Sequence, residues 1–351
     1  MELLGIRDVH ADLCCLQRVK DYLSFVAPVG YAPEFRFRAA IHQHALEIGR
    51  PIPEYNILIE GEHLRKKYTP SFTTSKGEDR ISDVKFKDFR GANGELIAWL
   101  WFGISRFEGV LKKENAMRGL RLRMRNIQIG DEDALQKLFR EDRGQHYFVG
   151  EVFALDQALI PNSQRDYFND NEARQQFENR LSDFFNSELS RIYKTGSQIN
   201  SKYSKIEKAQ AVEAELSEAE ASGGDVGEDL RGKWERAKKE AEKAAQELRK
   251  IRENTAAKLK DEGSGTVETV VHEILKANEE KHAARPPAAA APPAAGKRGK
   301  AGRIPKAGRA EKAAAPEEKL VPWRKIQEIV RALADPATAG AILAKIEEEL
   351  F

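Results

Sequence analysis

The chain of 351 residues has few of the features that are typical of exported or membrane-bound proteins. Its only two cysteines, Cys14 and Cys15, are adjacent in sequence, and neighbouring cysteines rarely reach disulfide geometry with each other. Its longest apolar run covers the nine residues 96–104, far short of the roughly 20 that a membrane-spanning helix needs. We therefore expect a cytoplasmic protein with no export signal and no membrane contact.

The chain also lacks an excess of charge of one sign, because 58 Lys and Arg residues stand against 56 Asp and Glu residues. The net charge of +2 gives no overall electrostatic case for a nucleic-acid partner. The positive charge is local, since residues 285–319 carry nine basic and three acidic side chains, a balance of +6. The remainder is therefore mildly acidic, at about −4 (2 minus 6).

Residues 1–195 hold most of the aromatic side chains and predict an α+β domain whose sheet is covered on one face by helices. Apolar residues at helical spacing predict three helices, over 8–26, 37–48 and 171–193. Alternating apolar residues bounded by turn signals predict a hairpin and four strands, over 55–68, 81–89, 95–105, 120–129 and 147–154. In the strand over 120–129, arginines alternate with apolar residues, which predicts a half-buried strand with a basic outer face.

Residues 196–282 are rich in Ala, Glu and Lys and predict a helical hairpin or coiled coil. A heptad seam steps alternately by four and three residues through Leu230, Trp234, Ala237, Ala241, Ala244, Leu248, Ile251 and Thr255. This seam predicts either an antiparallel hairpin within the chain or a coiled coil that forms a homodimer. The alternative is a single charged helix that packs on nothing.

The end of the chain differs again in composition. Residues 283–319 are rich in Ala, Pro, Gly, Lys and Arg, and they predict a disordered basic linker because they offer almost no large apolar side chains to bury. Residues 320–351 regain apolar residues at helical spacing, including Trp323, and predict a short helical module. The sequence thus predicts four parts, with boundaries at about 195, 282 and 319.

Most motifs that carry catalysis or nucleotide binding are absent. There is no phosphate-binding loop, no Gly-x-Gly-x-x-Gly, no nucleophile elbow and no zinc-spaced Cys and His set. His42 and His44 lie two residues apart and do not share a helix face, so we interpret them as surface residues and expect no metal site.

One loop stands out within residues 148–168, where a strand runs into Asn162 and then Arg165 ahead of a helix. A guanidinium binds phosphate oxygens as a fork, and a helix N-terminus adds partial positive charge and free N–H groups. The alternative is a solvated loop arginine without a function.

Residues 119–168, with the stretches GLRLRMRNIQIGDE and YFVGEVFALDQALIPNSQRDYF, resemble the transducer region of the GHKL ATPase superfamily. The resemblance is to bacterial members that are similar to the ninety-kilodalton heat-shock chaperones. The family core of an asparagine, two further residues, an arginine and an acidic residue is matched by Asn162, Arg165 and Asp166, whereas the proline position differs by one. Residues 20–68 also resemble the stretch that links the ATPase and transducer domains.

This resemblance implies a transducer fold like the second domain of small-subunit ribosomal protein five. It implies that Arg165 contacts the γ-phosphate of ATP, with Asn162 and Gln164 as neighbours that shape the loop or position water. The magnesium-binding asparagine and the adenine-binding Asp-x-Gly-x-Gly loop of the family are missing. We therefore expect ATP and Mg²⁺ to be held by an ATPase domain supplied in trans, and this chain alone neither to bind ATP tightly nor to hydrolyse it.

Two other functions stay open at the level of the sequence. The chain could be a non-enzymatic scaffold that binds partners through its helical region and its C-terminal module. It could also bind nucleic acid weakly and without sequence preference through the regularly spaced basic residues from Lys297 to Lys312, and that binding would weaken with salt.

Overall fold

The computed structural model describes residues 15–221, 227–260 and 265–283. The C-terminal module expected over 320–351 lies outside the described residues, and so does the linker expected over 283–319 apart from its first residue. None of the described helices is both long enough and apolar enough to cross a membrane.

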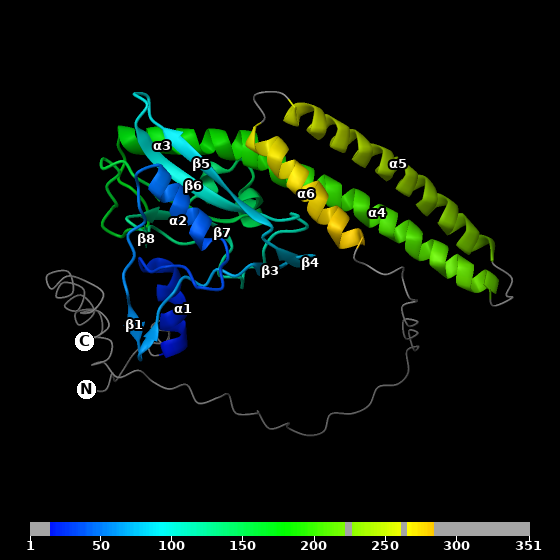
Figure 1. The fold of residues 1–351 in the computed structure, drawn as a ribbon, viewed down its shortest axis with the longest axis horizontal. Helices are drawn as coiled ribbons and strands as arrows, with labels where there is room; N and C mark the ends of the chain where they lie inside the picture. Colours follow the sequence, from blue (N-terminus) through cyan, green and yellow to red (C-terminus); the bar gives the residue numbers. More distant parts are fainter. Residues whose placement is uncertain (1–14, 222–226, 261–264, 284–351) are drawn as a thin grey trace, which may run out of the picture. The chain divides into compact units, whose positions relative to one another are not determined.

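A mixed five-stranded sheet is the centre of an α+β fold (Figure 1). The strand order is β5-β6-β9-β7-β8, and only the pair β7–β9 is parallel. The strands are β5 (Asp83–Arg90), β6 (Leu96–Ile104), β7 (Gly119–Met124), β8 (Ile127–Gln128) and β9 (Val149–Ala154). The strands expected over 81–89, 95–105 and 147–154 are confirmed, whereas 120–129 is a hairpin of two strands that turns at Arg125 and Asn126.

Both faces of the sheet are buried, so the prediction of helices on one face only is wrong. Leu100 and Phe102 of β6 belong to a core that includes residues of α3 (Glu172–Phe184). Trp99 and Trp101 point to a second core, which includes Ile41 of α2 (Arg38–Glu47). The cause is the uninterrupted apolar run of β6, because a strand that is apolar on both sides needs cover on both.

The elements before the sheet are short. They are α1 (Leu16–Val26), α2 and two small hairpins, β1 (Leu58–Ile59) with β2 (Glu62–His63) and β3 (Ser71–Thr74) with β4 (Gly77–Arg80). The hairpin expected over 55–68 is therefore present with shorter strands, and the β3–β4 hairpin was not expected from the sequence. Two 3₁₀ helices, Gln136–Leu138 and Asp142–Tyr147, lie between β8 and β9.

The helical region is continuous with the sheet domain. After α3, a π-helical turn (Phe185–Leu189) leads directly into α4 (Ser190–Ala221), so the boundary expected at residue 195 falls inside a helix. The next helices are α5 (Glu228–Leu259) and α6 (Thr266–Ala283). Val270 and Ile274 of α6 are fully buried in the same core as Phe102, so residues on both sides of 195 share one core.

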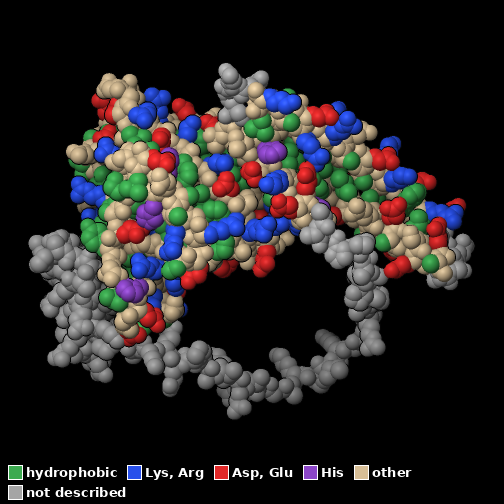
Figure 2. Space-filling model, viewed as in Figure 1, with side chains coloured by type: hydrophobic (Ala, Val, Ile, Leu, Met, Phe, Trp, Pro, Cys, Tyr) green, Lys and Arg blue, Asp and Glu red, His purple; other side chains and the backbone are tan. Residues whose placement is uncertain are grey.

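Helices α4 and α5 lie side by side and antiparallel (Figure 1). Lys202 of α4 pairs with Glu247 of α5, and Lys205 pairs with Glu240. A later residue on α4 therefore pairs with an earlier residue on α5, as antiparallel helices require. All eight seam residues are buried or half-buried. The hairpin prediction is confirmed, and the single unpacked helix is excluded. On the face drawn in Figure 2, Lys and Arg are interspersed with Asp and Glu along this helical pair.

Candidate functional site

The loop between β9 and α3 brings the three predicted site residues together. Asn162 donates its backbone N–H to the carbonyl of Tyr167 at 2.9 Å, and Pro161 pairs with Phe168 in an isolated bridge. The Asn162 amide also donates to the Asp166 carboxylate. These contacts close a tight turn that has Gln164 and Arg165 at its tip.

Arg165 has left-handed backbone, with φ of +55°, and its side chain is exposed. Its N–H donates to the carbonyl of Asn162 at 3.0 Å, and its carbonyl accepts from the N–H of Gly130 at 2.8 Å. Gly130 is required by this close approach, because a Cβ there would lie 2.4 Å from the carbonyl oxygen of Asp166. The guanidinium of Arg165 forms no ion pair with any residue that the structure describes. The Gln164 side chain forms no hydrogen bond with those residues either.

Arg165 precedes the following helix in the chain but does not belong to its first turn. Helix α3 begins at Glu172, seven residues after Arg165. Its first turn is capped by Asn171, whose side-chain oxygen accepts from the N–H of Arg174 at 2.8 Å and whose amide donates to Ala158 at 2.8 Å. The cap exists because asparagine is a strong N-cap residue, a signal already visible in the sequence.

The basic outer face expected for residues 120–129 is also wrong. Arg121 is only 5% exposed and Arg123 is fully buried, whereas Arg125 in the following turn is exposed. The physical reason is that β7 is an internal strand between β9 and β8 whose second face is covered by the preceding segments of the chain. Its arginines are therefore enclosed and must find buried partners.

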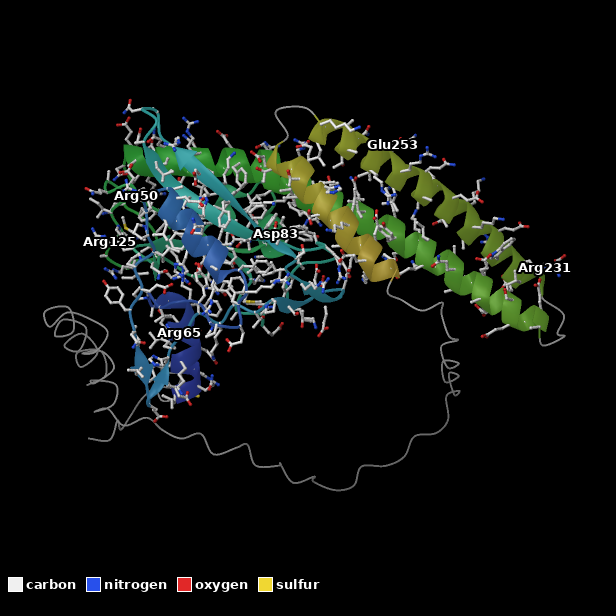
Figure 3. The ribbon with its side chains drawn as sticks, viewed as in Figure 1. Arg50, Arg65, Asp83, Arg125, Arg231 and Glu253 are labelled. Atoms are coloured by element: carbon white, nitrogen blue, oxygen red, sulfur yellow. The ribbon has the colours of Figure 1, made fainter. Side chains whose placement is uncertain are left out.

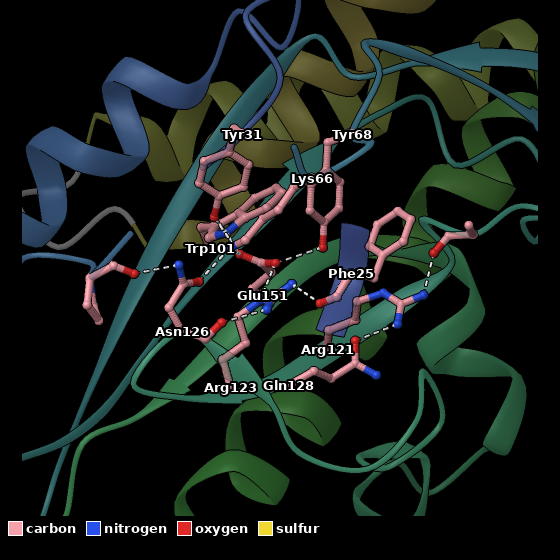
Figure 4. Close-up of polar contacts among 12 residues, drawn as sticks. Phe25, Tyr31, Lys66, Tyr68, Trp101, Arg121, Arg123, Asn126, Gln128 and Glu151 are labelled. Atoms are coloured by element: carbon pink, nitrogen blue, oxygen red, sulfur yellow. Dashed lines mark hydrogen bonds and ion pairs between the residues drawn. The ribbon is translucent and has the colours of Figure 1, made fainter. Parts of the chain in front are cut away.

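A fully buried carboxylate, Glu151 of β9, is the centre of these partners (Figure 4). One carboxylate oxygen accepts from Tyr31, from the Lys66 ammonium at 3.0 Å and from the Trp101 indole at 3.3 Å; the other accepts from Tyr68 at 3.1 Å and from Arg123. Five donors from four segments of the chain therefore meet one carboxylate.

Two buried cations face this single carboxylate. The Lys66 ammonium also donates to the side-chain oxygen of Asn126 at 2.7 Å and lies 4.3 Å from the centre of the Tyr31 ring. Arg123 also donates to the carbonyls of Asn126 and Phe25, at 2.9 and 2.8 Å. The cluster is thus fully hydrogen-bonded, and it carries an excess of one positive charge when Lys66 is protonated.

Burial and the neighbouring charges together shift the pKa values in the cluster. Burial and then the neighbouring Arg123 lower the pKa of Lys66 to about 7, although Glu151 acts in the opposite direction. Burial alone would raise the pKa of Glu151, but Arg123 and Lys66 lower it to about 2. Lys66 is therefore the group whose pKa, about 7, places its change of charge near neutral pH.

We expect the free energy of unfolding to depend on pH through Lys66. The unfolded chain keeps this proton up to about pH 10.5 and the folded chain loses it near pH 7, so the unfolded state binds more protons in between. The wild type should therefore gain stability relative to Lys66→Met as the pH rises from 7 to 10, with a limiting slope of about 1.4 kcal/mol per pH unit. Urea unfolding of both proteins measures this difference, and a pH-independent difference would contradict it.

The sequence interpretation missed this cluster. One signal was present, because Glu151 is the only charged residue in the apolar stretch 148–154. A carboxylate in such a strand needs a buried partner. Its partners were not identifiable, since Lys66 lies 85 residues and Tyr31 120 residues away in the sequence.

The two histidines singled out in the sequence have ordinary partners. His42 contacts Glu54 at 3.0 Å, and His44 contacts Asp88 at 3.0 Å and stacks on Phe86. Within residues 15–221, 227–260 and 265–283, no three His, Cys, Asp or Glu side chains gather closely enough to hold a metal ion.

No protein-family model matches the chain, and no curated protein matches it.

Proposed function

We propose that this chain is the transducer part of a chaperone-like GHKL ATP-binding protein and that Arg165 contacts the γ-phosphate of an ATP held by another domain or chain. Support comes first from the residues that resemble the family, Asn162, Arg165 and Asp166. The observation that carries the proposal is the presentation of Arg165, whose guanidinium is exposed and unpaired among the described residues on a turn closed by hydrogen bonds.

Physical chemistry favours a function for this arginine over a solvated surface position. Left-handed backbone at a residue other than glycine costs about 1–3 kcal/mol, and such strain persists where the surrounding structure imposes it. A guanidinium without a carboxylate partner needs no rearrangement before it binds phosphate oxygens as a fork. An arginine that is supplied to a nucleotide site in this way raises the rate by about 10³–10⁵ in the best-studied GTPases.

Hydrogen bonds join the Arg165 loop to the residues after β8 and to the start of α3, so a displacement of this loop by bound nucleotide is transmitted to the sheet and the helix. The Arg165 carbonyl accepts from the N–H of Gly130, two residues after β8, and the side chain of Asn171 bonds the start of α3 to Ala158 of the same loop. In the proposed complex, Asn162 fixes the turn, and Gln164 is free to bind water or phosphate. A shift of Arg165 toward a phosphate would then displace the end of β8 and the start of α3 together.

The test is ATP hydrolysis by a GHKL-type ATP-binding domain from the same genome, measured with and without the purified full chain. The chain alone should show no turnover, because ATP and Mg²⁺ are held by the other domain. Adding it should stimulate hydrolysis, and Arg165→Ala should reduce that stimulation about 100-fold or more. The matched control is Arg180→Ala, since Arg180 is exposed on α3 and forms no ion pair with the described residues.

Arg174→Ala would be a poorer control than Arg180→Ala. The Arg174 side chain bonds to Glu178 and to the carbonyl of Phe168, at 3.2 and 3.1 Å, so its loss disturbs the same loop. Turnover by the purified chain at ordinary enzyme rates, or full stimulation by Arg165→Ala, would contradict the proposal.

A second candidate function is a cytoplasmic scaffold that binds partners through its helices. It is favoured by α5, where Leu230 and Trp234 at the start of the seam are only half-buried although Ala244 and Leu248 further along are buried. Self-association that requires residues 226–262, in a chain that stimulates no ATPase, would support the scaffold. Retention of DNA that disappears when residues 285–319 are deleted would instead support weak nucleic-acid binding through Lys297 to Lys312.

A further inference from the structure

A cavity of about 610 Å³ opens where the parallel strands β7 and β9 end, at Met124 and Ala154. Residues 49–53, which follow α2, form another part of its wall, and Trp99 of β6 contributes to the lining. The carboxyl ends of parallel strands are a common place for ligands, because the loops that leave them diverge and form a crevice. The cavity is separate from the buried Glu151. Leu155 and Gln157, at the start of the β9–α3 loop, line it, but Asn162, Gln164 and Arg165 do not.

The charges that line this cavity have one sign. Arg50 and Arg125 line it, and among the residues that the structure describes no Asp or Glu does. Both arginines are exposed, and neither forms an ion pair with a residue that the structure describes. Figure 3 shows both at the same end of the molecule. Two unpaired guanidinium groups beside one cavity favour a ligand with a doubly charged anionic group.

Arg50 also lines a neighbouring cavity, and two acidic side chains line that cavity with it. These are Glu95 and Asp156. The Glu95 carboxylate accepts a backbone N–H at 3.0 Å, and the Asp156 carboxylate accepts another at 2.9 Å, so both are already engaged in turns of their own. Neither carboxylate forms an ion pair with Arg50 or Arg125 in the described part of the chain.

Arg125 occupies a position that its side chain does not favour. It forms the turn between β7 and β8 with Asn126, and φ is +50° at Arg125 and +65° at Asn126. A two-residue hairpin turn with two positive φ values favours Asn or Gly at its first position, where an arginine is strained. Strain of this kind gathers at binding sites, where a particular side chain must project from a particular place.

The wall of the cavity is formed before any ligand arrives. Asn126 is fully buried; its amide donates to the carbonyl of Pro53 at 2.8 Å, and its side-chain oxygen accepts from Lys66 at 2.7 Å. It therefore joins the turn to the opposite wall of the cavity. The backbone carbonyl of Asn126 also accepts from Arg123, so two buried cations lie directly behind the turn. Their excess over Glu151 adds positive potential to the cavity.

We propose that this cavity binds a small organic phosphate monoester. The guanidinium groups of Arg50 and Arg125 hold the phosphate, because their planar forks match its oxygens and their two charges match a dianion. The apolar part of the molecule lies against Ile52, Phe153 and Leu155, which line the same cavity. The assignment does not depend on the proposed role in ATP hydrolysis.

The experiment is calorimetric titration of the full chain with phenyl phosphate at low ionic strength. The wild type should bind it, and Arg50→Ala and Arg125→Asn should each weaken the affinity about tenfold or more. Arg231→Ala is the matched control, because Arg231 is an exposed arginine at the far end of α5 (Figure 3) and its side chain has no partner among the described residues. Its affinity should equal that of the wild type.

A second measurement separates loss of binding from loss of structure. Asparagine adopts positive φ with less strain than arginine does, so Arg125→Asn should keep or raise the melting temperature while it weakens binding. A variant that loses binding and also unfolds at a lower temperature would overturn the role of Arg125 as a ligand-binding residue.

Two further probes define the ligand class. Inorganic phosphate should bind more weakly than phenyl phosphate, since it has no apolar part, and benzoate should bind more weakly because it carries one charge. Equal affinity for inorganic phosphate would overturn the assignment of an organic ligand, and equal or tighter binding of benzoate would overturn the assignment of phosphate. No heat of binding with any probe at millimolar concentration would overturn the site.

Discussion

Glu151→Gln is expected to lower the free energy of unfolding by about 3–5 kcal/mol, the usual cost when one partner of a buried ion pair is removed. The reason is that Arg123 remains buried and charged beside a neutral amide, which cannot compensate it, and that the buried amine of Lys66 loses the carboxylate that stabilises its charged form. The amide also places a donor where the carboxylate accepted from five groups. Urea unfolding followed by circular dichroism measures the change.

The control and the rescue make this prediction specific. Glu253→Gln removes a carboxylate whose partner, Arg249, lies one helical turn away on the exposed side of α5 (Figure 3), and it should leave stability unchanged. Adding Lys66→Met to Glu151→Gln removes a buried amine that has lost its carboxylate partner, so the double variant should be more stable than Glu151→Gln alone. A double variant that is less stable than the single one would show that the cations do not cause the loss.

Gly150→Ala is expected to cost about 3 kcal/mol or more, at the upper end of the range for an overpacked core. A Cβ at this position of β9 would lie 2.2 Å from the carbonyl oxygen of Trp101 and 3.0 Å from the Cα of Phe102. Both atoms belong to the backbone of β6, so strands β6 and β9 would have to separate at the centre of the sheet. A variant that is recovered only as aggregate meets this expectation as well.

Gly232→Ala is the matched control for that experiment, with an effect of the opposite sign. Gly232 lies inside α5, and the nearest atom to its added Cβ is the end of the Arg236 side chain at 3.7 Å. Alanine should therefore stabilise the helix by about 0.5–1 kcal/mol. Equal stability of the two variants would contradict the argument that the clash with the β6 backbone, and not the loss of a glycine as such, determines the cost of Gly150→Ala.

The elements predicted best are those whose signal is local. The apolar run of β6 predicts its strand within about one residue, because apolar side chains on both faces of a strand are recorded in the sequence itself. The seam from Leu230 to Thr255 predicts which side of α5 is buried, since a heptad spacing fixes one helical face. Neither pattern contains information about the partner that covers it.

The predictions that were wrong concern which segments of the chain pack against one another. Alternation in residues 120–129 predicts a strand, but it cannot tell an edge strand from an internal one, and this difference determines whether Arg123 is exposed or buried. The turn at Arg125 and Asn126 was overlooked because its residues are not the Asn-Gly pair that usually signals such a hairpin. Without this turn, the sequence did not predict the cavity that Arg125 lines.

By itself, the sequence determined the α+β class, the positions of the main strands, the helical hairpin and the loop that joins Asn162, Gln164 and Arg165, because each of these depends on residues that are close together in the chain. Only the tertiary structure decided that both sheet faces are covered, that Lys66 meets Glu151, and that Arg50 and Arg125 line one cavity. These arrangements join segments that are far apart in the sequence. Burial of the apolar residues of β6 requires cover on both faces, and desolvation of Glu151 requires buried partners, but no local pattern records which segments supply them.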